Sequence, residues 1–214
     1  GILDLTGAAQ ATSNYLSNVT VLNDSQITSV NNITPRFGSL TFPVRSGGST
    51  SPIILTVATG GTVFTGTTTL TGDAIFNPTA AGSGNFNVLE GQVTDAGRLE
   101  KWGAGTLVLT NGAGFAGSIT QNNYAGSTVV NAGTLATTAG GASDTPFGAG
   151  SVTVQAGASL RLANPNNVTG TGTLVVNSDL TGLGAIAMGY NGALTSATTL
   201  VFNNGNTGGP FSGV

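Results

Sequence analysis

The chain of 214 residues contains no cysteine and no histidine. Most zinc, haem and iron–sulfur sites need one of these residues, so the remaining metal candidates are oxygen-bound cations such as calcium. The lack of disulfides does not argue against secretion, because a repeat protein gains stability from stacking its repeats. No run of 18 apolar residues is present, so we expect no membrane-spanning helix.

Charged residues are also scarce, at 6% of the chain, with five basic and eight acidic side chains and a formal net charge of −3. Nucleic-acid binding requires a basic surface that neutralises phosphates, and no such stripe is present. We therefore expect no nucleic-acid partner, and a surface covered mainly by Thr, Ser, Asn and Gln.

What the chain does have is an eight-residue pattern that occurs five times, typified by GTLVLTNG and GSVTVQAG. The copies span residues 105–112, 126–133, 150–157, 172–179 and 198–205, and their starts are offset by 21, 24, 22 and 26 residues. This period is too short for a propeller blade or a helical repeat, but it fits one coil of a β-solenoid.

Within each copy, apolar and polar residues alternate with period two, which is typical of a half-buried strand. Stacking the copies predicts two inward columns, one of Leu107, Thr128, Val152, Leu174 and Leu200 and one of Leu109, Val130, Val154, Val176 and Phe202. The same stacking predicts an outward polar column of Thr110, Asn131, Gln155, Asn177 and Asn203. Further strands of each coil are expected at residues 118–120, 134–136 and 159–162, and helix content should be minimal.

The pattern divides the chain into two regions. Residues 98–214 carry the regular solenoid repeats, and residues 1–97 are expected to form irregular coils, with a distinct N-terminal β-sandwich as the alternative. The chain begins with Gly1 and the repeats continue to residue 205 without a polar cap. We expect it to be a processed or partial piece of a longer protein.

Residues 98–112, RLEKWGAGTLVLTNG, resemble the autotransporter-associated β-strand repeat, also called the passenger-associated transport repeat. The first half of that pattern is matched by Leu99, Lys101, Gly103, Gly105, Thr106, Leu107, Leu109 and Gly112. The second half is matched by Tyr124, Gly126, Thr128, Val130, Ala132, Gly133, Thr134 and Leu135. The chain departs from the pattern at Trp102 and in residues 113–123, a longer link that suggests a protruding loop.

The resemblance implies a right-handed parallel β-helix on a secreted or cell-surface bacterial protein. Together with the repeat offsets, it predicts an all-β fold, a right-handed parallel β-helix or β-solenoid, with coils of about 21–26 residues. The expected localisation is extracellular or at the bacterial cell surface.

Few residues are candidates for chemistry. Asp73, Asp95, Asp144 and Asp179 lie in loop-like surroundings, where an aspartate is most simply a turn former. A calcium ion near Asn23–Asp24 or Asp144–Thr145 is the alternative, although the nonapeptide of calcium-binding β-rolls is absent. We expect no catalytic, cofactor-binding or metal-binding residues.

Adjacent residues of a strand point to opposite faces, so Glu100 and Lys101 should diverge, solvated or packed on Trp102. A partner-binding loop is expected in the longer link and its edge, with Phe115, Gln121, Asn122, Asn123 and Tyr124 as its contact residues.

The leading functional hypothesis is a non-enzymatic structural module, a β-helix stalk or a self-assembling fibre or surface-layer subunit. Its partner would be a second copy, joined end to end. The alternative is a cell-surface adhesin that binds glycans or host surfaces through loops on the β-helix. A polysaccharide-cleaving enzyme is the third hypothesis, and it requires two carboxylates facing one groove.

Overall fold

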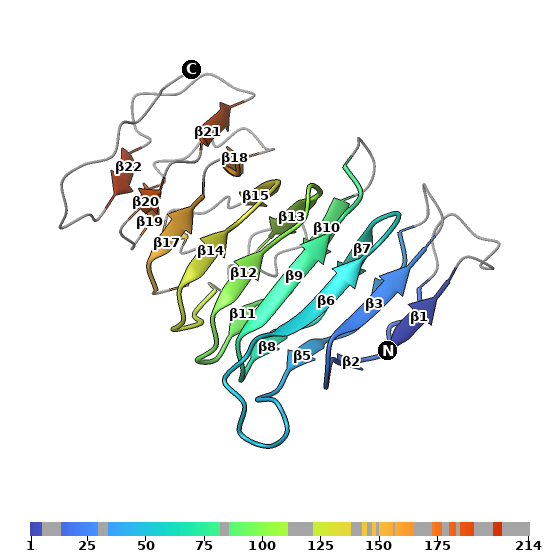
Figure 1. Cartoon of the computed structure of the whole chain (residues 1–214). Helices are drawn as coiled ribbons and strands as arrows, with labels where there is room; N and C mark the ends of the chain where they lie inside the picture. Colours follow the sequence, from blue (N-terminus) through green and yellow to red (C-terminus); the bar gives the residue numbers. More distant parts are fainter. Residues whose placement is uncertain are drawn as a thin grey trace.

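The computed structural model describes residues 1–5, 14–29, 34–81, 86–110, 122–137, 143–144, 147–148, 150–155, 157–164, 173–176, 180–182, 185–190 and 199–202. Over these residues the protein is all-β without a helix, and its strands form parallel sheets stacked as a β-solenoid (Figure 1). The fold class expected from the repeats is confirmed.

Sheet A is the longest of the four sheets and runs along most of the solenoid. In spatial order its described strands are β1 (Ile2–Asp4), β3 (Ser25–Thr28), β6 (Ile53–Val57), β9 (Ala74–Pro78), β12 (Leu99–Lys101), β14 (Thr128–Val130), β17 (Val152–Val154) and β20 (Leu180–Gly182). Strands from before and after residue 97 are paired within this one sheet, at β9 and β12.

The other sheets form the remaining sides of the coils. Sheet B contains β4 (Arg36–Phe37), β7 (Thr62–Phe64), β10 (Phe86–Leu89), β13 (Thr106–Leu109), β15 (Thr134–Thr137), β18 (Ser159–Asn164) and β21 (Ala185–Tyr190). Sheet C contains β2 (Val19–Thr20), β5 (Leu40–Phe42), β8 (Thr68–Leu70) and β11 (Val93–Thr94). Sheet D contains β16 (Ser143–Asp144), β19 (Thr173–Val176) and β22 (Thr199–Phe202).

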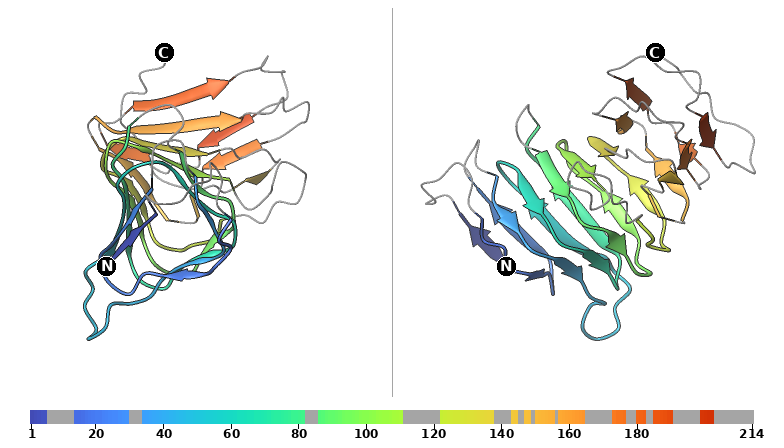
Figure 2. Two further views of the ribbon diagram at one scale, coloured as in Figure 1. Left: turned by 90° about the vertical axis from the view of Figure 1, so that its right-hand side faces the viewer. Right: turned by 180° about the vertical axis from the view of Figure 1, so that it is seen from behind.

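A coil uses one strand from each of three sheets. β6, β7 and β8 follow one another in sheets A, B and C, and β9 then returns to sheet A beside β6 (Figure 2). Paired residues of successive coils are 20 positions apart at Phe86 and Thr106 but 30 apart at Ser25 and Leu55. The coils therefore vary more than the predicted 21–26 residues, because corner loops such as residues 43–52 differ in length.

Alternation within the strands places apolar side chains inside the coils. In sheet A, the second inward position of successive coils forms one column: Leu55, Phe76, Lys101, Val130 and Val154. In sheet B, the Phe37 and Phe64 rings stack with centroids 5.4 Å apart, and Tyr15 stacks on Phe37 at 5.6 Å. Like side chains of adjacent coils thus lie directly over one another, as in-register parallel pairing requires.

The five sequence copies do not form a single column. Leu107 lies in sheet B, whereas Thr128 and Val152 are paired in sheet A and Leu174 and Leu200 are paired in sheet D. The predicted stacking is correct for these two pairs and wrong for the other steps. The Gly-Thr-Leu-x-Leu pattern specifies a turn followed by a half-buried strand, and any side of the coil accepts such a segment.

Threonines directly after strands bind each coil to the previous one. Both the backbone N and Oγ1 of Thr65 donate to the carbonyl oxygen of Phe37, at 3.0 and 2.8 Å. Thr110 does the same to Leu89, at 3.1 and 3.3 Å. The hydroxyl therefore adds a second donor at the position where the strand ladder ends, which gives the many threonines a structural use.

Glycines line the corner between sheets C and A. Gly72, Gly97, Gly126 and Gly150 occupy this corner in successive coils, and a Cβ atom on any of the last three would overlap the carbonyl oxygen of the glycine before it. The coils approach each other here through bare backbone, so a side chain would force them apart.

We expect Gly97→Ala to lower the free energy of unfolding by about 3 kcal/mol or more, because its Cβ atom would overlap two backbone carbonyl groups. Gly47→Ala is the matched control, since Gly47 has a φ of 84° but no atom within 4 Å of the added Cβ. This control should lose only about 1–2 kcal/mol from backbone strain. Denaturant titrations followed by circular dichroism measure both, and equal losses would refute the close-approach argument.

Candidate functional site

The most concentrated set of polar side chains lies on the outer face of sheet A and is called here the Glu100 cluster. It consists of Asp73, Arg98, Glu100, Trp102 and Asn131. Arg98 Nη2 is 2.7 Å from Glu100 Oε1 and 3.5 Å from Asp73 Oδ2. Trp102 Nε1 and Asn131 Nδ2 both donate to Glu100 Oε2, at 2.8 and 3.0 Å. Both oxygens of this carboxylate are therefore engaged, and the cluster joins three successive coils.

The strand register explains how these residues meet. Asp73, Arg98 and Asn131 stand directly before β9, directly before β12 and directly after β14, and the three strands are neighbours in sheet A. The backbone N of Arg98 also donates to Asp73 Oδ1, at 2.8 Å. Two carboxylates and one guanidinium give the cluster a formal charge of −1, in a chain with few charges elsewhere.

Trp102 is the only tryptophan of the chain, and its side chain is exposed, at 42%. It belongs to a row of outward side chains that we call the outer row. At corresponding positions of successive coils, the outer row contains Gln26, Thr56, Asn77, Trp102, Asn131 and Gln155. The row therefore places polar side chains, mostly amides, on both sides of an exposed indole.

The outer row agrees only in part with the predicted outward column of Thr110, Asn131, Gln155, Asn177 and Asn203. Asn131 and Gln155 lie in adjacent coils as predicted, and the backbone N of Gln155 donates to Val130 O at 2.9 Å. Thr110 instead follows β13 in sheet B. Asn177 and Asn203 lie outside the described residues.

Lys101 points into the solenoid, opposite to Glu100, and is fully buried. Its Nζ donates to the carbonyl oxygens of Trp102, Gly103 and Ala132, the last at 2.9 Å from the following coil. Burial lowers the pKa of Lys101 to about 7, because the interior disfavours the ammonium form. The predicted divergence of the two side chains is correct, whereas the predicted solvation of Lys101 is wrong.

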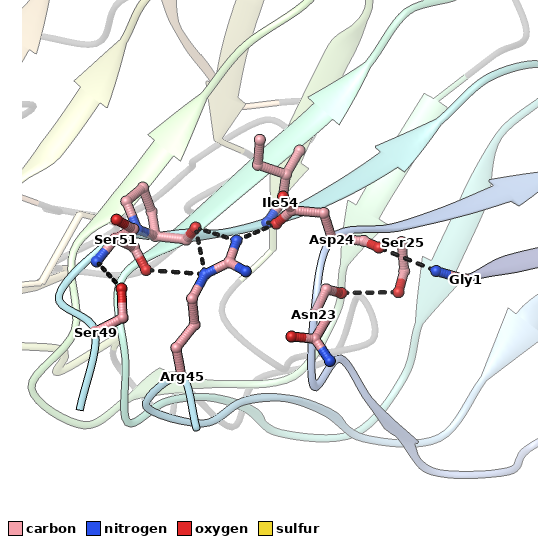
Figure 3. A network of polar contacts seen from close by, with 9 residues as sticks. Gly1, Asn23, Asp24, Ser25, Arg45, Ser49, Ser51 and Ile54 are labelled. Carbon is pink, nitrogen blue, oxygen red and sulfur yellow. Dashed lines mark hydrogen bonds and ion pairs between the residues drawn. The ribbon is translucent and has the colours of Figure 1, made fainter. Parts of the chain in front are cut away.

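A second polar network holds the loop between β5 and β6, residues 43–52, which projects from the stack (Figure 1). The Arg45 guanidinium pairs with the Asp24 carboxylate, and its Nη2 donates to Pro52 O at 2.9 Å (Figure 3). Asp24 Oδ1 also accepts the backbone N of Ile54, at 3.0 Å. These contacts fasten the loop to two neighbouring coils.

A shallow hollow of about 210 Å³ lies between this loop and the corner before β9. Its charged lining groups are Arg45 and Asp73, which are paired with Asp24 and Arg98 respectively. Both charged side chains already have partners. The rest of the lining consists mainly of small side chains and backbone, so the hollow has no unpaired charged group that could act on a substrate.

The predicted partner-binding loop falls partly inside the fold. Tyr124 is fully buried and its hydroxyl shares a hydrogen bond with Thr128, and burial raises the pKa of Tyr124 above its usual range. Asn122 is also buried, and its Oδ1 accepts the backbone N of Val93 at 2.7 Å. The side chains of Asn122 and Tyr124 therefore belong to the core and are not accessible to a partner, whereas Asn123 is exposed. Phe115 and Gln121 lie outside the described residues.

The predicted turn-forming acids bind backbone donors where they are described. Asp95 has a φ of 83° and accepts the backbone N of Ala96 at 2.9 Å and the Thr71 hydroxyl at 2.9 Å. Asp73 accepts the backbone N of Arg98, as given above. The backbone of Asp144 belongs to β16, and Asp179 lies outside the described residues.

The Asn23–Asp24 pair, considered for calcium, is occupied by other partners. Asp24 holds Arg45, and Asn23 O accepts the Ser25 hydroxyl at 2.8 Å. In the described part of the chain, no three acidic side chains gather in a way that would hold a metal ion. The same part contains no helix long and apolar enough to cross a membrane.

The repeat pattern does not predict the Glu100 cluster, although the sequence contains a local concentration of charged residues there. Four charged residues, Asp95, Arg98, Glu100 and Lys101, lie within seven positions of a chain that is only 6% charged. The pairing with Asp73 and Asn131 depends on the coil-to-coil register, which the repeat pattern did not specify.

By its fold, the protein belongs to the class of parallel β-solenoids. Comparison of the chain with protein-family models, curated proteins and solved structures finds no match. The functional argument therefore rests on the fold and on the surfaces described above.

The buried Lys101 predicts a pH-dependent stability. The folded-state pKa of about 7 lies below the ordinary value of 10.5, so between these values the unfolded chain binds a proton that the folded chain does not. The free energy of unfolding should therefore rise as pH increases from 7 to 9.5, by a few kcal/mol at about 1.4 kcal/mol per pKa unit. Urea titrations at several pH values measure this rise.

Lys101→Met is the control, and it should remove the rise while lowering stability at every pH, because three carbonyl groups lose their donor. The chain has no histidine or cysteine, so few other groups titrate in this range. A flat profile for the unaltered chain would show that the three carbonyl groups keep Lys101 protonated.

Proposed function

We propose that this chain is a non-enzymatic structural module, a stiff β-solenoid rod that joins further copies end to end on or outside the bacterial surface. The observation that carries this proposal is the N-terminal end of the described stack, called here the open end, where apolar side chains are exposed and β1 has no described strand on its outer side. The continuous core supports the rod, since one cluster of buried side chains extends from Val21 to Leu160.

Among the side chains that the structure describes, large apolar ones are exposed mainly at this end. Five of the seven found among the described residues belong to the first 22 positions: Ile2, Leu3, Tyr15, Leu16 and Leu22. Leu16 is 62% exposed, and Tyr15 covers one side of the Phe37 ring while its own outer side has no described ring against it. A concentration of exposed apolar side chains in one region of the stack favours an interaction surface there.

The strand edge at the same end offers the matching backbone contacts. β1 pairs with β3 on one side and has no described strand on its other side (Figure 2). An open edge is a template for another strand. At the far end of the described stack, sheets A and B finish with β20 and β21. Pairing these two different ends is a head-to-tail contact, which produces an open filament when successive copies do not close into a ring.

The extracellular bacterial setting is supported by the sequence resemblance described above. The residues that carry it, from Leu99 to Gly112 and from Tyr124 to Leu135, resemble the autotransporter-associated β-strand repeat, which is found on secreted and surface proteins. We therefore propose membership of this family as well. The low charge of the chain also favours close packing of rods, because little repulsion opposes it.

An enzymatic role is less well supported by the geometry. Glycoside hydrolysis needs one carboxyl group that releases a proton and a second that stays available to the substrate. Asp73 and Glu100 do lie on one face of neighbouring coils, but both are paired with Arg98, and Glu100 Oε2 accepts two further hydrogen bonds. A binding role has one specific observation in its favour, the exposed Trp102, which is developed below.

The proposal predicts that the purified chain forms longer particles as its concentration rises, with filaments visible by negative-stain electron microscopy. Leu16→Asp should raise the concentration needed for association by roughly tenfold, because it places a charge within the apolar contact. Aspartate tolerates the positive φ of 51° at this position, so the fold should remain.

Asn123→Asp is the matched control, because Asn123 is exposed but lies shortly before β14, several coils along the stack from the open end. It should leave association unchanged. Separate rods of constant length at every concentration would overturn the end-to-end contact and leave a stalk segment as the structural role.

A further inference from the structure

We propose that the outer row of sheet A, centred on Trp102, binds a neutral, linear, β-linked oligosaccharide that lies along the solenoid axis. This proposed binding site is on the face of a sheet and does not involve the open end. Glycan binding and end-to-end association can therefore be tested separately. It also differs from the loop site predicted from the sequence, whose Asn122 and Tyr124 are buried.

The first argument is the state of the indole ring. Trp102 is exposed at 42%, although the other described aromatic side chains, apart from Tyr15 at the open end, are buried. Its N–H group is held at 2.8 Å by Glu100 Oε2, and Glu100 is itself fixed by Arg98 and Asn131. The ring is therefore anchored before any ligand arrives, which lowers the entropy cost of binding. An anchored indole suits the C–H face of a sugar ring.

The second argument is the chemistry beside the ring. Asn77 and Asn131 occupy the same position as Trp102 in the previous and following coils. Thr56 and Gln155 extend the row by one further coil on each side. Amide and hydroxyl groups both donate and accept hydrogen bonds, as sugar hydroxyl groups require of their partners.

The third argument is the shape of the row. Six successive coils contribute to it, and at about 4.8 Å per strand spacing they span about 24 Å along the axis. A straight row of this length fits several consecutive rings of an extended oligosaccharide better than one compact ligand.

The fourth argument is charge. The Glu100 cluster carries a formal charge of −1 and the chain −3, and its one guanidinium is shared by two carboxylates. An anionic glycan would be repelled, because Arg98 is not free to neutralise it. The ligand class that this surface fits is therefore neutral.

The single tryptophan makes the test direct. Titrations with cellohexaose and with hexa-N-acetylchitohexaose should each be followed by Trp102 fluorescence. At least one of them should give a saturable change in the emission. Oligogalacturonate of the same length should give none. No change with either neutral hexasaccharide at millimolar concentration, or an equal response to the anionic one, would overturn the proposal.

Three variants locate the site, with affinity measured by isothermal titration calorimetry. Trp102→Ala should weaken binding roughly tenfold or more, because it removes the stacking surface. Asn131→Ala should weaken it several-fold, whereas Asn123→Ala, an exposed amide on a different corner, should leave it unchanged. Circular dichroism confirms folding of each variant. If Trp102→Ala does not fold, the two asparagine variants still decide, and equal affinities for them would place binding elsewhere.

Discussion

The structure depends on parallel, in-register hydrogen bonding between successive coils. Each coil satisfies its backbone groups through the coils on either side, so the spacing between strands must be nearly constant along the stack. The corner glycines Gly72, Gly97, Gly126 and Gly150 follow from this constraint, because a Cβ atom there would hold two coils apart. The threonines after the strands follow from it as well, since their hydroxyl groups give the last carbonyl oxygen of the ladder a second donor.

The same register decides what the few charged residues do. Lys101 occupies an inward column between Phe76 and Val130, where water cannot reach it, and three carbonyl groups replace its hydration. Glu100, one residue earlier, faces outward and gathers Arg98, Trp102 and Asn131 from this coil and the next. Among the described residues, a chain with little charge therefore places two carboxylates, a guanidinium and an amide together on one face of sheet A. That concentration, next to an exposed indole, is the reason for proposing sheet A as a binding face.

The sequence was sufficient to predict the fold class but not the placement of its repeats. The alternation in residues 105–112 and 150–157 reports strands with one buried face, and the all-β solenoid follows from it. The pattern does not specify which side of the coil a strand occupies. It therefore predicts one column for Leu107 and Thr128, although the two residues lie in different sheets. Tyr124 was misjudged for a related reason. Its neighbours in sequence suggest a loop, and only the tertiary structure shows that it is fully buried, with its hydroxyl bonded to Thr128 of the same coil and its ring close to Gly148 of the next coil.

By itself, the sequence determined the strands, the turns and the lack of thiol or imidazole chemistry, because these depend on residue type and on neighbours a few positions away. The tertiary structure decided which residues from different coils meet: Asp73 with Arg98, Glu100 with Asn131, and Lys101 with Ala132. These contacts join residues 25 to 31 positions apart. Corner loops of unequal length change that separation from coil to coil, so no fixed period in the sequence encodes it.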